Sequence, residues 1–188
     1  MTMPPAVYFL TSARVGFRTW SEADLPLALS LWGDPQVTHY IDSRGALSPE
    51  EVKERLQREI ATQQSAGVQY WPIFLLANGD FLGCAGLRPH RPAEAIYEFG
   101  VHLRAAHWGQ GYATEAGRAA LQYAFERLGA KGVFAGHHPR NQPSRRMLIA
   151  LGFRYTRDEL YPPTGLHHPS YLMEAADLTP SRPSDPGA

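Results

Sequence analysis

The sequence is poor in cysteine, has no excess charge of either sign and lacks long hydrophobic runs. Cys84 is the only cysteine among the 188 residues, so neither an internal disulfide nor a multi-cysteine zinc site can form. The 18 lysines and arginines equal the 18 aspartates and glutamates in number, so no net field attracts nucleic acid or an anionic membrane. Apolar runs such as residues 73–77 fall far short of the roughly 20 residues that a membrane helix needs. Residues 1–10 also lack the pattern of a signal peptide. We therefore expect a soluble, cytoplasmic protein with neither a nucleic-acid nor a membrane partner.

The chain length predicts one domain and a short tail. A single domain over 1–178 is long enough to bury a substantial core, whereas two full domains are not expected. Residues 179–188 contain three prolines, two serines and a glycine, with too little apolar surface to offset the entropy of ordering. We predict a flexible tail there.

Hydrophobic periodicity and cap signals predict alternating strands and helices. Ser48, Pro49 and Glu51 form the clearest helix start, with an N-cap, a first-turn proline and a capping-box acid. A loop is expected over residues 88–94, which contain two prolines. The predicted helices span residues 21–32, 48–64, 112–128 and 143–151. The predicted strands span residues 13–18, 70–77, 81–87, 96–103, 133–137, 153–159 and 171–175.

The most informative segment is residues 104–116, where a predicted strand leads through a glycine loop into a helix. Gly109 and Gly111 let the backbone approach a ligand closely, and the free amides of a helix start favour an anion such as a pyrophosphate. The alternative is that both glycines only shape a tight turn. A dinucleotide-binding fold fits less well, because Thr114 replaces the third glycine or alanine and no acid ends the next strand.

At this point the sequence resembles a known family. The segment Trp108-Gly-Gln-Gly-Tyr-Ala-Thr-Glu-Ala116, with Asn141-Gln-Pro-Ser144 and the residues up to Phe153, is similar to the Rim-type (ribosomal-protein-alanine acetyltransferase-like) branch of the GCN5-related N-acetyltransferase (GNAT) superfamily. The resemblance implies the α/β GNAT fold, with a mostly antiparallel twisted sheet of about seven strands, splayed middle strands and about four flanking helices. It also implies acetyl-CoA as co-substrate and no metal.

The resemblance implies a binding site for the co-substrate. The glycine loop would hold the pyrophosphate, and the backbone of Val101 and Leu103 would pair with the pantetheine arm. Arg104 would supply the charge that the family usually places where this chain has Ala106. The residues implied in binding are Val101, Leu103, Arg104, Trp108, Gly109, Gln110, Gly111, Tyr112, Ala113, Asn141 and Ser144.

The catalytic residues are less well defined by the sequence. Acetyl transfer to an amine needs a base, a donor for the oxyanion and a proton for the departing thiolate. Glu98 is our first candidate base, because apolar neighbours would raise its pKa, although a structural acid is the alternative. Glu159 and His138 are reserves. Leu148 replaces a tyrosine acid common in the family, so Ser144 or a water would protonate the thiolate; a backbone amide would hold the oxyanion.

Other residues leave alternatives open. Asn141 and Ser144 could simply cap a helix. The pairs His137-His138 and His167-His168 lack the spacing that completes a metal site. A set of aromatic residues could line an acceptor pocket or belong to the core. These aromatic residues are Tyr40, Tyr70, Trp71 and Tyr97.

The resulting prediction is an N-acetyltransferase that uses a ternary complex with a primary amine, either a small molecule or a protein N-terminus. A catalytically weak acyl-CoA sensor is the alternative, because Leu148 cannot donate a proton. A nucleotide-binding oxidoreductase is a third hypothesis. The sequence does not decide between a monomer and a homodimer.

Overall fold

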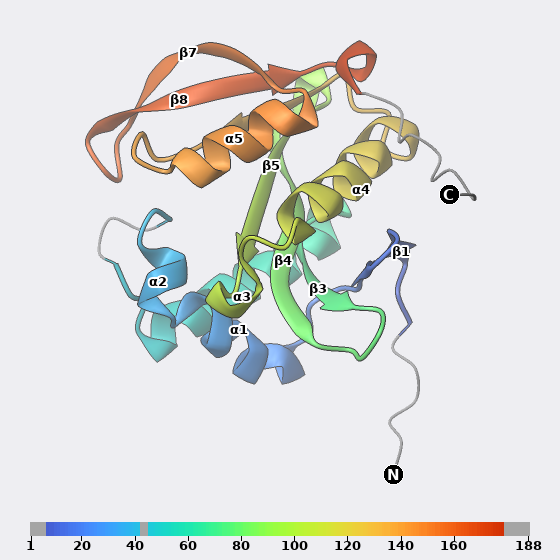
Figure 1. Ribbon diagram of the computed structural model, residues 1–188, viewed down its shortest axis with the longest axis vertical. Coiled ribbons are helices and arrows are strands. Elements are labelled where there is room, and N and C mark those ends of the chain that lie inside the picture. Colours follow the sequence, from blue (N-terminus) through green and yellow to red (C-terminus); the bar gives the residue numbers. More distant parts are fainter. Residues whose placement is uncertain (1–6, 42–44, 179–188) are drawn as a thin grey trace.

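An open, twisted, eight-stranded sheet runs through the computed structural model, which describes residues 7–41 and 45–178 (Figure 1). The strand order is β1-β2-β3-β4-β5-β6-β8-β7, and only the β5–β6 pair is parallel. The mostly antiparallel sheet is as predicted, with one more strand because a short β1 pairs with β2. The strands are β1 (Leu10–Thr11), β2 (Val15–Phe17), β3 (Tyr70–Leu75), β4 (Phe81–Arg91), β5 (Ile96–Leu103), β6 (Gly132–Gly136), β7 (Arg154–Tyr161) and β8 (Leu166–Met173).

The described residues form five α-helices, against about four expected. The additional helix, α2, is a single turn: the Asp34 carboxylate accepts a hydrogen bond from Gln36 N at 2.9 Å and Pro35 occupies the first turn. The helices are α1 (Leu25–Trp32), α2 (Pro35–Thr38), α3 (Pro49–Ala66), α4 (Tyr112–Glu126) and α5 (Gln142–Leu151). Short 3-10 turns are η1 (Glu22–Asp24), η2 (Pro92–Glu94), η3 (Ala105–His107) and η4 (Ala175–Asp177). The tail predicted at 179–188 lies outside the described residues.

Helix α3 begins and ends where its sequence signals predict. Ser48 Oγ accepts from Glu51 N at 3.2 Å, and the Glu51 carboxylate accepts from Ser48 N at 2.8 Å. Gly67 ends the helix in the left-handed conformation, with φ of 71°. The helix therefore holds Arg55 and Glu59, four residues apart, on the same side.

The loop predicted over residues 88–94 was wrong in its first half. Strand β4 continues to Arg91 and places Arg88 directly opposite Glu98 on β5. The register shifts between Pro89 and Arg91, and such an irregularity accommodates a proline within a strand. Pairing with β5 thus outweighs the loop-like composition. The last strand also starts earlier than predicted, because β8 forms a hairpin with β7.

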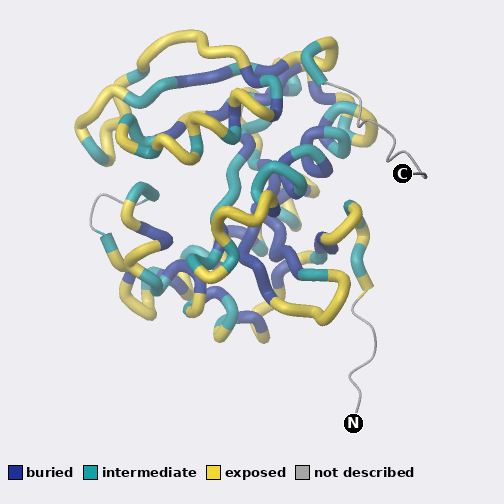
Figure 2. Tube along the Cα trace, viewed as in Figure 1, coloured by how far each residue is buried: buried dark blue, intermediate teal, exposed yellow. Residues whose placement is uncertain are grey.

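Two layers of helices cover the two faces of the sheet. Helices α4 and α5 pack on one face, and α1 and α3 pack on the other, so that the buried residues form two core clusters (Figures 1 and 2). Residues of β5 alternate between them. Leu103 belongs to the core under α4 and Val101 packs against it, whereas His102 contacts Trp32 of α1 and Gly100 contacts Tyr70.

Strands β5 and β6 separate at the centre of the sheet. They pair only at Ile96↔Gly132, Tyr97↔Val133 and Glu98↔Phe134. Beyond Glu98, β5 continues to Leu103 without β6 beside it. The splayed middle strands implied by the family resemblance are therefore confirmed. They leave a gap between β5 and β6 that connects the two faces of the sheet.

Candidate active site

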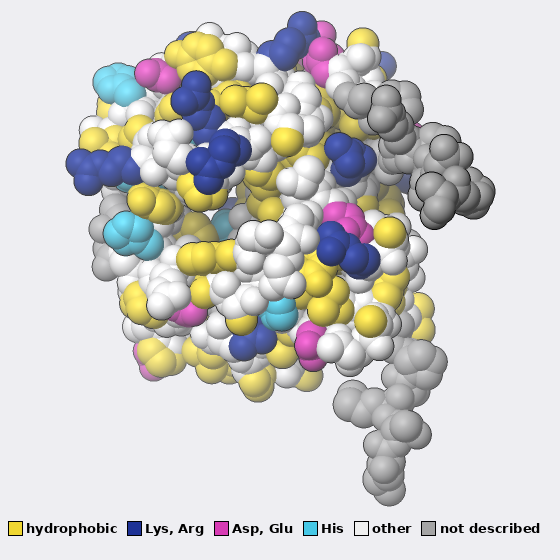
Figure 3. All heavy atoms as spheres, in the orientation of Figure 1, with side chains coloured by type: hydrophobic (Ala, Val, Ile, Leu, Met, Phe, Trp, Pro, Cys, Tyr) yellow, Lys and Arg dark blue, Asp and Glu magenta, His cyan; other side chains and the backbone are white. Residues whose placement is uncertain are grey.

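A large cleft passes through this gap. Its volume is about 1630 Å³, and it is bordered by the glycine loop and α5 on one side and by α2, α3 and β4 on the other. In the space-filling view, a hollow separates the part built around α5 from the part built around α1 and α3 (Figure 3). Because the cleft reaches both faces of the sheet, one ligand can approach from each.

The glycine loop leaves the start of α4 bare. Gly109 and Gly111 have φ angles of 73° and 83°, a conformation that side chains disfavour. Gly111 is the N-cap of α4 and has no side chain to accept from the first-turn amides. Apart from its two chain neighbours, no described residue has an atom within 4 Å of a Cβ built at Gly109. Open space before uncapped amides suits the phosphates of an extended ligand.

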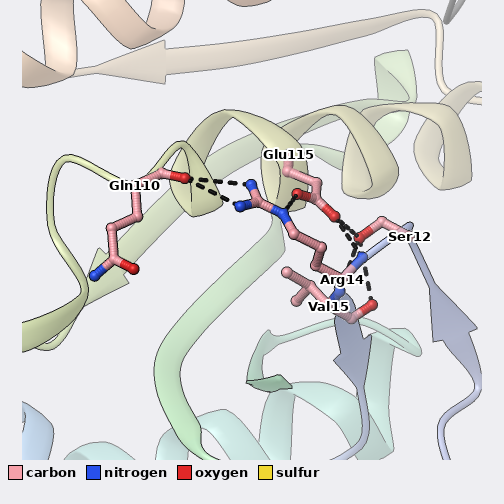
Figure 4. A network of polar contacts seen from close by, with 5 residues as sticks. All are labelled: Ser12, Arg14, Val15, Gln110 and Glu115. Carbon is pink, nitrogen blue, oxygen red and sulfur yellow. Dashed lines mark hydrogen bonds and ion pairs between the residues drawn. The ribbon is translucent and has the colours of Figure 1, made fainter. Parts of the chain in front are cut away.

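Arg14 and Glu115 hold this loop in place (Figure 4). Arg14 Nε donates to Glu115 Oε2 at 2.7 Å, and both terminal nitrogens donate to Gln110 O at 3.3 Å. Ser12 Oγ donates to Glu115 Oε1 at 2.7 Å. Burial opposes ionisation of Glu115, but the hydrogen bonds from Ser12 and Arg14 outweigh it and lower the pKa of this carboxyl. The arginine also lies 4.4 Å above the Tyr112 ring, while its charge is paired with that of Glu115.

All the residues implied in co-substrate binding border the cleft except Arg104 and Gln110. An Arg104 terminal nitrogen donates to Phe81 O at 3.3 Å, and Gln110 Nε2 donates to Ala106 O at 3.1 Å. Their roles in binding remain predictions. The arginine found at the loop is Arg14, which no local sequence pattern places there.

Asn141 and Ser144 both border the cleft, and the structure shows a cap role for Asn141. Asn141 Oδ1 accepts from Ser144 N at 3.1 Å, so Asn141 caps α5. The Ser144 hydroxyl makes no hydrogen bond to any residue within 7–41 or 45–178, and Ser144 borders the cleft. This hydroxyl is therefore available to a ligand. Leu148, one turn further along, is buried.

On the other face, a buried ion pair supports Tyr70. The Glu59 carboxylate forms an ion pair with Arg88 and accepts from Tyr70 N at 2.9 Å. The Arg88 guanidinium lies 4.1 Å from the centre of the Tyr70 ring. Burial, followed by the charge of Glu98, raises the pKa of the phenol well above its usual value, so Tyr70 stays protonated. Neither Glu59 nor Arg88 was predicted as a site residue, although a glutamate on the apolar face of α3 is a detectable signal.

His102 is a partly buried, neutral imidazole in the same region. Its Nδ1 accepts from Trp32 Nε1 at 3.2 Å, which leaves the ring proton on Nε2. Burial, followed by the charges of Arg55 and Arg88, lowers the pKa of His102 well below 6.5. The ring therefore acts as a fixed polar group.

The three candidate bases differ in how many hydrogen bonds their oxygen or nitrogen lone pairs already accept. Glu159 accepts from Ser170 Oγ at 2.6 Å and from Arg157 Nη2 at 2.6 Å, and these contacts lower its pKa. His138 Nδ1 accepts from Arg140 N at 3.2 Å, so its remaining nitrogen carries the proton when the ring is neutral. Glu98 is half-buried, borders the cleft and forms no hydrogen bond with a described side chain.

Glu98 also has a charged neighbour that the sequence did not reveal. Arg88 lies opposite it on β4, while Phe134 lies beside it on β6. The expected apolar surroundings are thus found on one side only. No group of three histidine, cysteine or acidic residues that could hold a metal occurs within 7–41 and 45–178. Over the same ranges, no helix combines the length and the apolar character needed to cross a bilayer.

The sheet separates at its centre, and α4 starts beside the gap with a glycine N-cap. This arrangement is typical of enzymes that bind an extended, phosphorylated acyl carrier. The chain belongs to the acetyltransferase (GNAT) family: the model of the acetyltransferase (GNAT) domain matches residues 14–154. It is therefore an acyltransferase that uses acetyl-CoA, as its resemblance predicted.

Comparison with individual proteins agrees with this assignment. The uncharacterised protein YkkB of Bacillus subtilis (strain 168) is 28% identical over 150 residues, which cover 79% of this chain and 86% of YkkB. The uncharacterised N-acetyltransferase p20 of Bacillus licheniformis is 24% identical over 145 residues, covering 77% and 82%. The structure of RimL, the ribosomal L7/L12 alpha-N-protein acetyltransferase, in complex with coenzyme A superposes with a TM-score of 0.75. That match is 18% identical and covers 89% of this chain and 98% of RimL, so it supports the fold alone.

Proposed function

We propose that the enzyme transfers the acetyl group of acetyl-CoA directly to a primary amine within a ternary complex. The observation that carries this proposal is the alternation of β5 beside the gap. Val101 and Leu103 face the α4 side, where the bare helix start lies. Gly100 and His102 face the α3 side, where Tyr70 and Trp32 contact them. Two substrates can thus meet through the gap from opposite faces.

The residues around the gap supply each chemical requirement of this reaction. The α4 amides would hold the phosphates, with Arg14 fixing the loop through Gln110 O. The edge of β5 that faces the gap beyond Glu98, where β6 no longer pairs with it, would bind the pantetheine arm and the developing oxyanion. We assign the base to Glu98, because its lone pairs are free and it borders the cleft. Glu98 would accept a proton from the amine, directly or through a water.

Two hydroxyl groups can donate protons from the two faces. Ser144 lies on α5, the co-substrate side, with a hydroxyl free to protonate the departing thiolate. Tyr70 lies on the acceptor side and is protonated, so it can donate a hydrogen bond to the tetrahedral intermediate. Leu148 stands where the family commonly has a tyrosine acid, and its side chain has no proton to donate. Ser144 and Tyr70 would supply the proton and the hydrogen bond instead.

A two-substrate kinetic study of the full chain tests the proposal. Initial rates measured over a matrix of acetyl-CoA and amine concentrations should give intersecting double-reciprocal lines, with acetylated amine identified by mass spectrometry. Glu98→Gln should lower kcat by about a hundredfold or more, because general-base catalysis contributes on that scale, while leaving the Kd for acetyl-CoA unchanged. Glu94→Gln, at an exposed acid near the same strand, is the matched control.

The outcomes separate this proposal from its alternative. Parallel lines would contradict direct transfer. Tight binding of acetyl-CoA without turnover on a broad panel of amines would instead favour an acyl-CoA sensor, the alternative function suggested by Leu148.

A further inference from the structure

Arg55 is a partly buried cation at the acceptor end of the cleft. It lies on α3, and its guanidinium carbon is 4.8 Å from the centre of the Trp32 ring. Its Nε atom is fully buried and has no hydrogen-bond partner. The side chain nevertheless borders the cleft. A guanidinium with five N–H donors is thus held at the cleft by an aromatic face.

No acid among the described residues is paired with Arg55, and the charge of Glu59 only partly offsets the burial that opposes its charged form. Within 7–41 and 45–178 its guanidinium forms no ion pair. Glu59, one turn along α3, is already engaged by Arg88 and by the Tyr70 amide. Burial, followed by the charge of Arg88, lowers the pKa of Arg55, so both effects act against its charged form. An anion bound in the cleft would offset both.

The neighbours of Arg55 indicate where such an anion would sit. Arg55 interacts electrostatically with Tyr70, Cys84 and His102, which belong to the α3 side of the sheet. Glu98 interacts electrostatically with the same Tyr70. Arg55, Tyr70 and Glu98 all border the same cleft, so the cation and the proposed base can reach one ligand. The amides at the start of α4, which have no side-chain cap and suit phosphates, lie on the opposite face of the sheet.

We infer that the acceptor amine carries a carboxylate, which Arg55 binds while Glu98 receives the proton of the amine. This inference rests on the proposed function and narrows it to small amino acids and related aminocarboxylates. A protein N-terminus fits less well, because its α-carboxyl group is consumed in the peptide bond. A fork-like guanidinium recognises a carboxylate through two parallel hydrogen bonds.

Paired substrates test the inference directly. The purified full chain is assayed with L-phenylalanine against 2-phenylethylamine, L-histidine against histamine, and 4-aminobutyrate against butylamine. In at least one pair, the aminocarboxylate should have the higher kcat/KM. Arg55→Met should raise KM for that aminocarboxylate by about tenfold to a hundredfold, the range for losing a charge-assisted pair, and leave KM for acetyl-CoA unchanged. Arg55→Lys should retain part of the preference.

Controls distinguish a specific site from general charge and from misfolding. Arg58→Met removes an exposed arginine of the same helix and the same cleft, and should leave the preference intact. Replacing a buried charge by an apolar side chain of similar length is often neutral for stability, so Arg55→Met should fold. Thermal unfolding of each variant checks this.

A binding assay keeps the inference separate from the proposed function. Phenylacetate, which has a carboxylate but no amine, should raise the thermal midpoint of the wild type and not that of Arg55→Met. If phenylacetate does so while no amine is acetylated, the proposed function fails and the anion site stands. The inference is overturned if Arg55→Met lowers activity equally on both members of each pair. It is also overturned if a tetrapeptide N-terminus is acetylated faster than every aminocarboxylate.

Discussion

The ring of Tyr70 lies directly against the backbone of Gly100. A Cβ built at position 100 would come within 2.4 Å of Tyr70 Cζ and 2.6 Å of the hydroxyl oxygen. Only glycine leaves room there, so the phenol of β3 reaches across β4 to β5 at the point where β5 borders the gap. The same contact brings a protonated hydroxyl beside the proposed path of the acetyl group.

Gly100→Ala should therefore displace Tyr70. Overpacking of this kind typically costs about 1–3 kcal/mol, so the free energy of unfolding should fall by that amount. Urea unfolding measures the loss of stability, and steady-state kinetics should show a lower kcat. Unchanged stability and unchanged kcat together would show that the ring does not occupy this position.

Tyr70→Phe removes the hydroxyl without moving the ring. Because this hydroxyl makes no hydrogen bond to a described residue, we expect a change in the free energy of unfolding of at most about 0.5 kcal/mol. If the hydroxyl donates to the intermediate, kcat should fall by about tenfold or more, with KM for acetyl-CoA retained. Tyr97→Phe, on the opposite face of β5, should leave kcat unaffected. Equal effects of both variants would argue against a role for Tyr70.

Gly109→Glu should abolish the binding of acetyl-CoA. It places a carboxylate where the phosphates are expected, in space that is now open. Gly79→Glu is a matched control, since Gly79 has a φ of 76° against 73° at Gly109, also has open space around it, and lies in the β3–β4 turn. Both variants should show similar strain in thermal unfolding. Isothermal titration with acetyl-CoA should separate them, and binding by Gly109→Glu would argue against the site.

Glu115→Gln should destabilise the fold in a pH-dependent way. Its folded pKa lies below the ordinary value of 4.5, so the ionised form is favoured in the native state. That contribution, about 1–2 kcal/mol for charge-assisted hydrogen bonds, is complete above the unfolded pKa and is lost as pH falls through the folded pKa. The gap in unfolding free energy between wild type and Glu115→Gln should thus narrow on acidification. Glu126→Gln, at an exposed position of the same helix, should show no such gap.

Cys84 should be inert in the native protein. The side chain is fully buried, and burial, followed by the charge of Glu59, raises the pKa of the thiol to about 12. Iodoacetamide at mildly alkaline pH should leave the native chain unmodified and label it fully in denaturant, as measured by intact mass. Rapid labelling of the native chain would instead show a reactive thiol that could accept the acetyl group as an acyl-cysteine, a step that direct transfer does not require.

The sequence predicted much of the fold because its signals are local. The capping box at Ser48, the left-handed glycines and the apolar strands each depend on neighbouring residues, and the corresponding elements are where they were expected, apart from the extension of β4 and the earlier start of β8. The glycine pattern between Trp108 and Ala116 also pointed to the family, since a bare helix start needs that spacing.

What the sequence alone determined was therefore the family, the order of elements and the loop that suits phosphates. The tertiary structure decided which distant side chains meet. Arg14, just before β2, reaches the glycine loop, and Glu59 of α3 pairs with Arg88 of β4. Arg55 forms no ion pair with any residue that the structure describes. These relationships depend on strand register and on which face of a helix turns inward. Neither is encoded by neighbouring residues, because both are set by packing across the whole sheet.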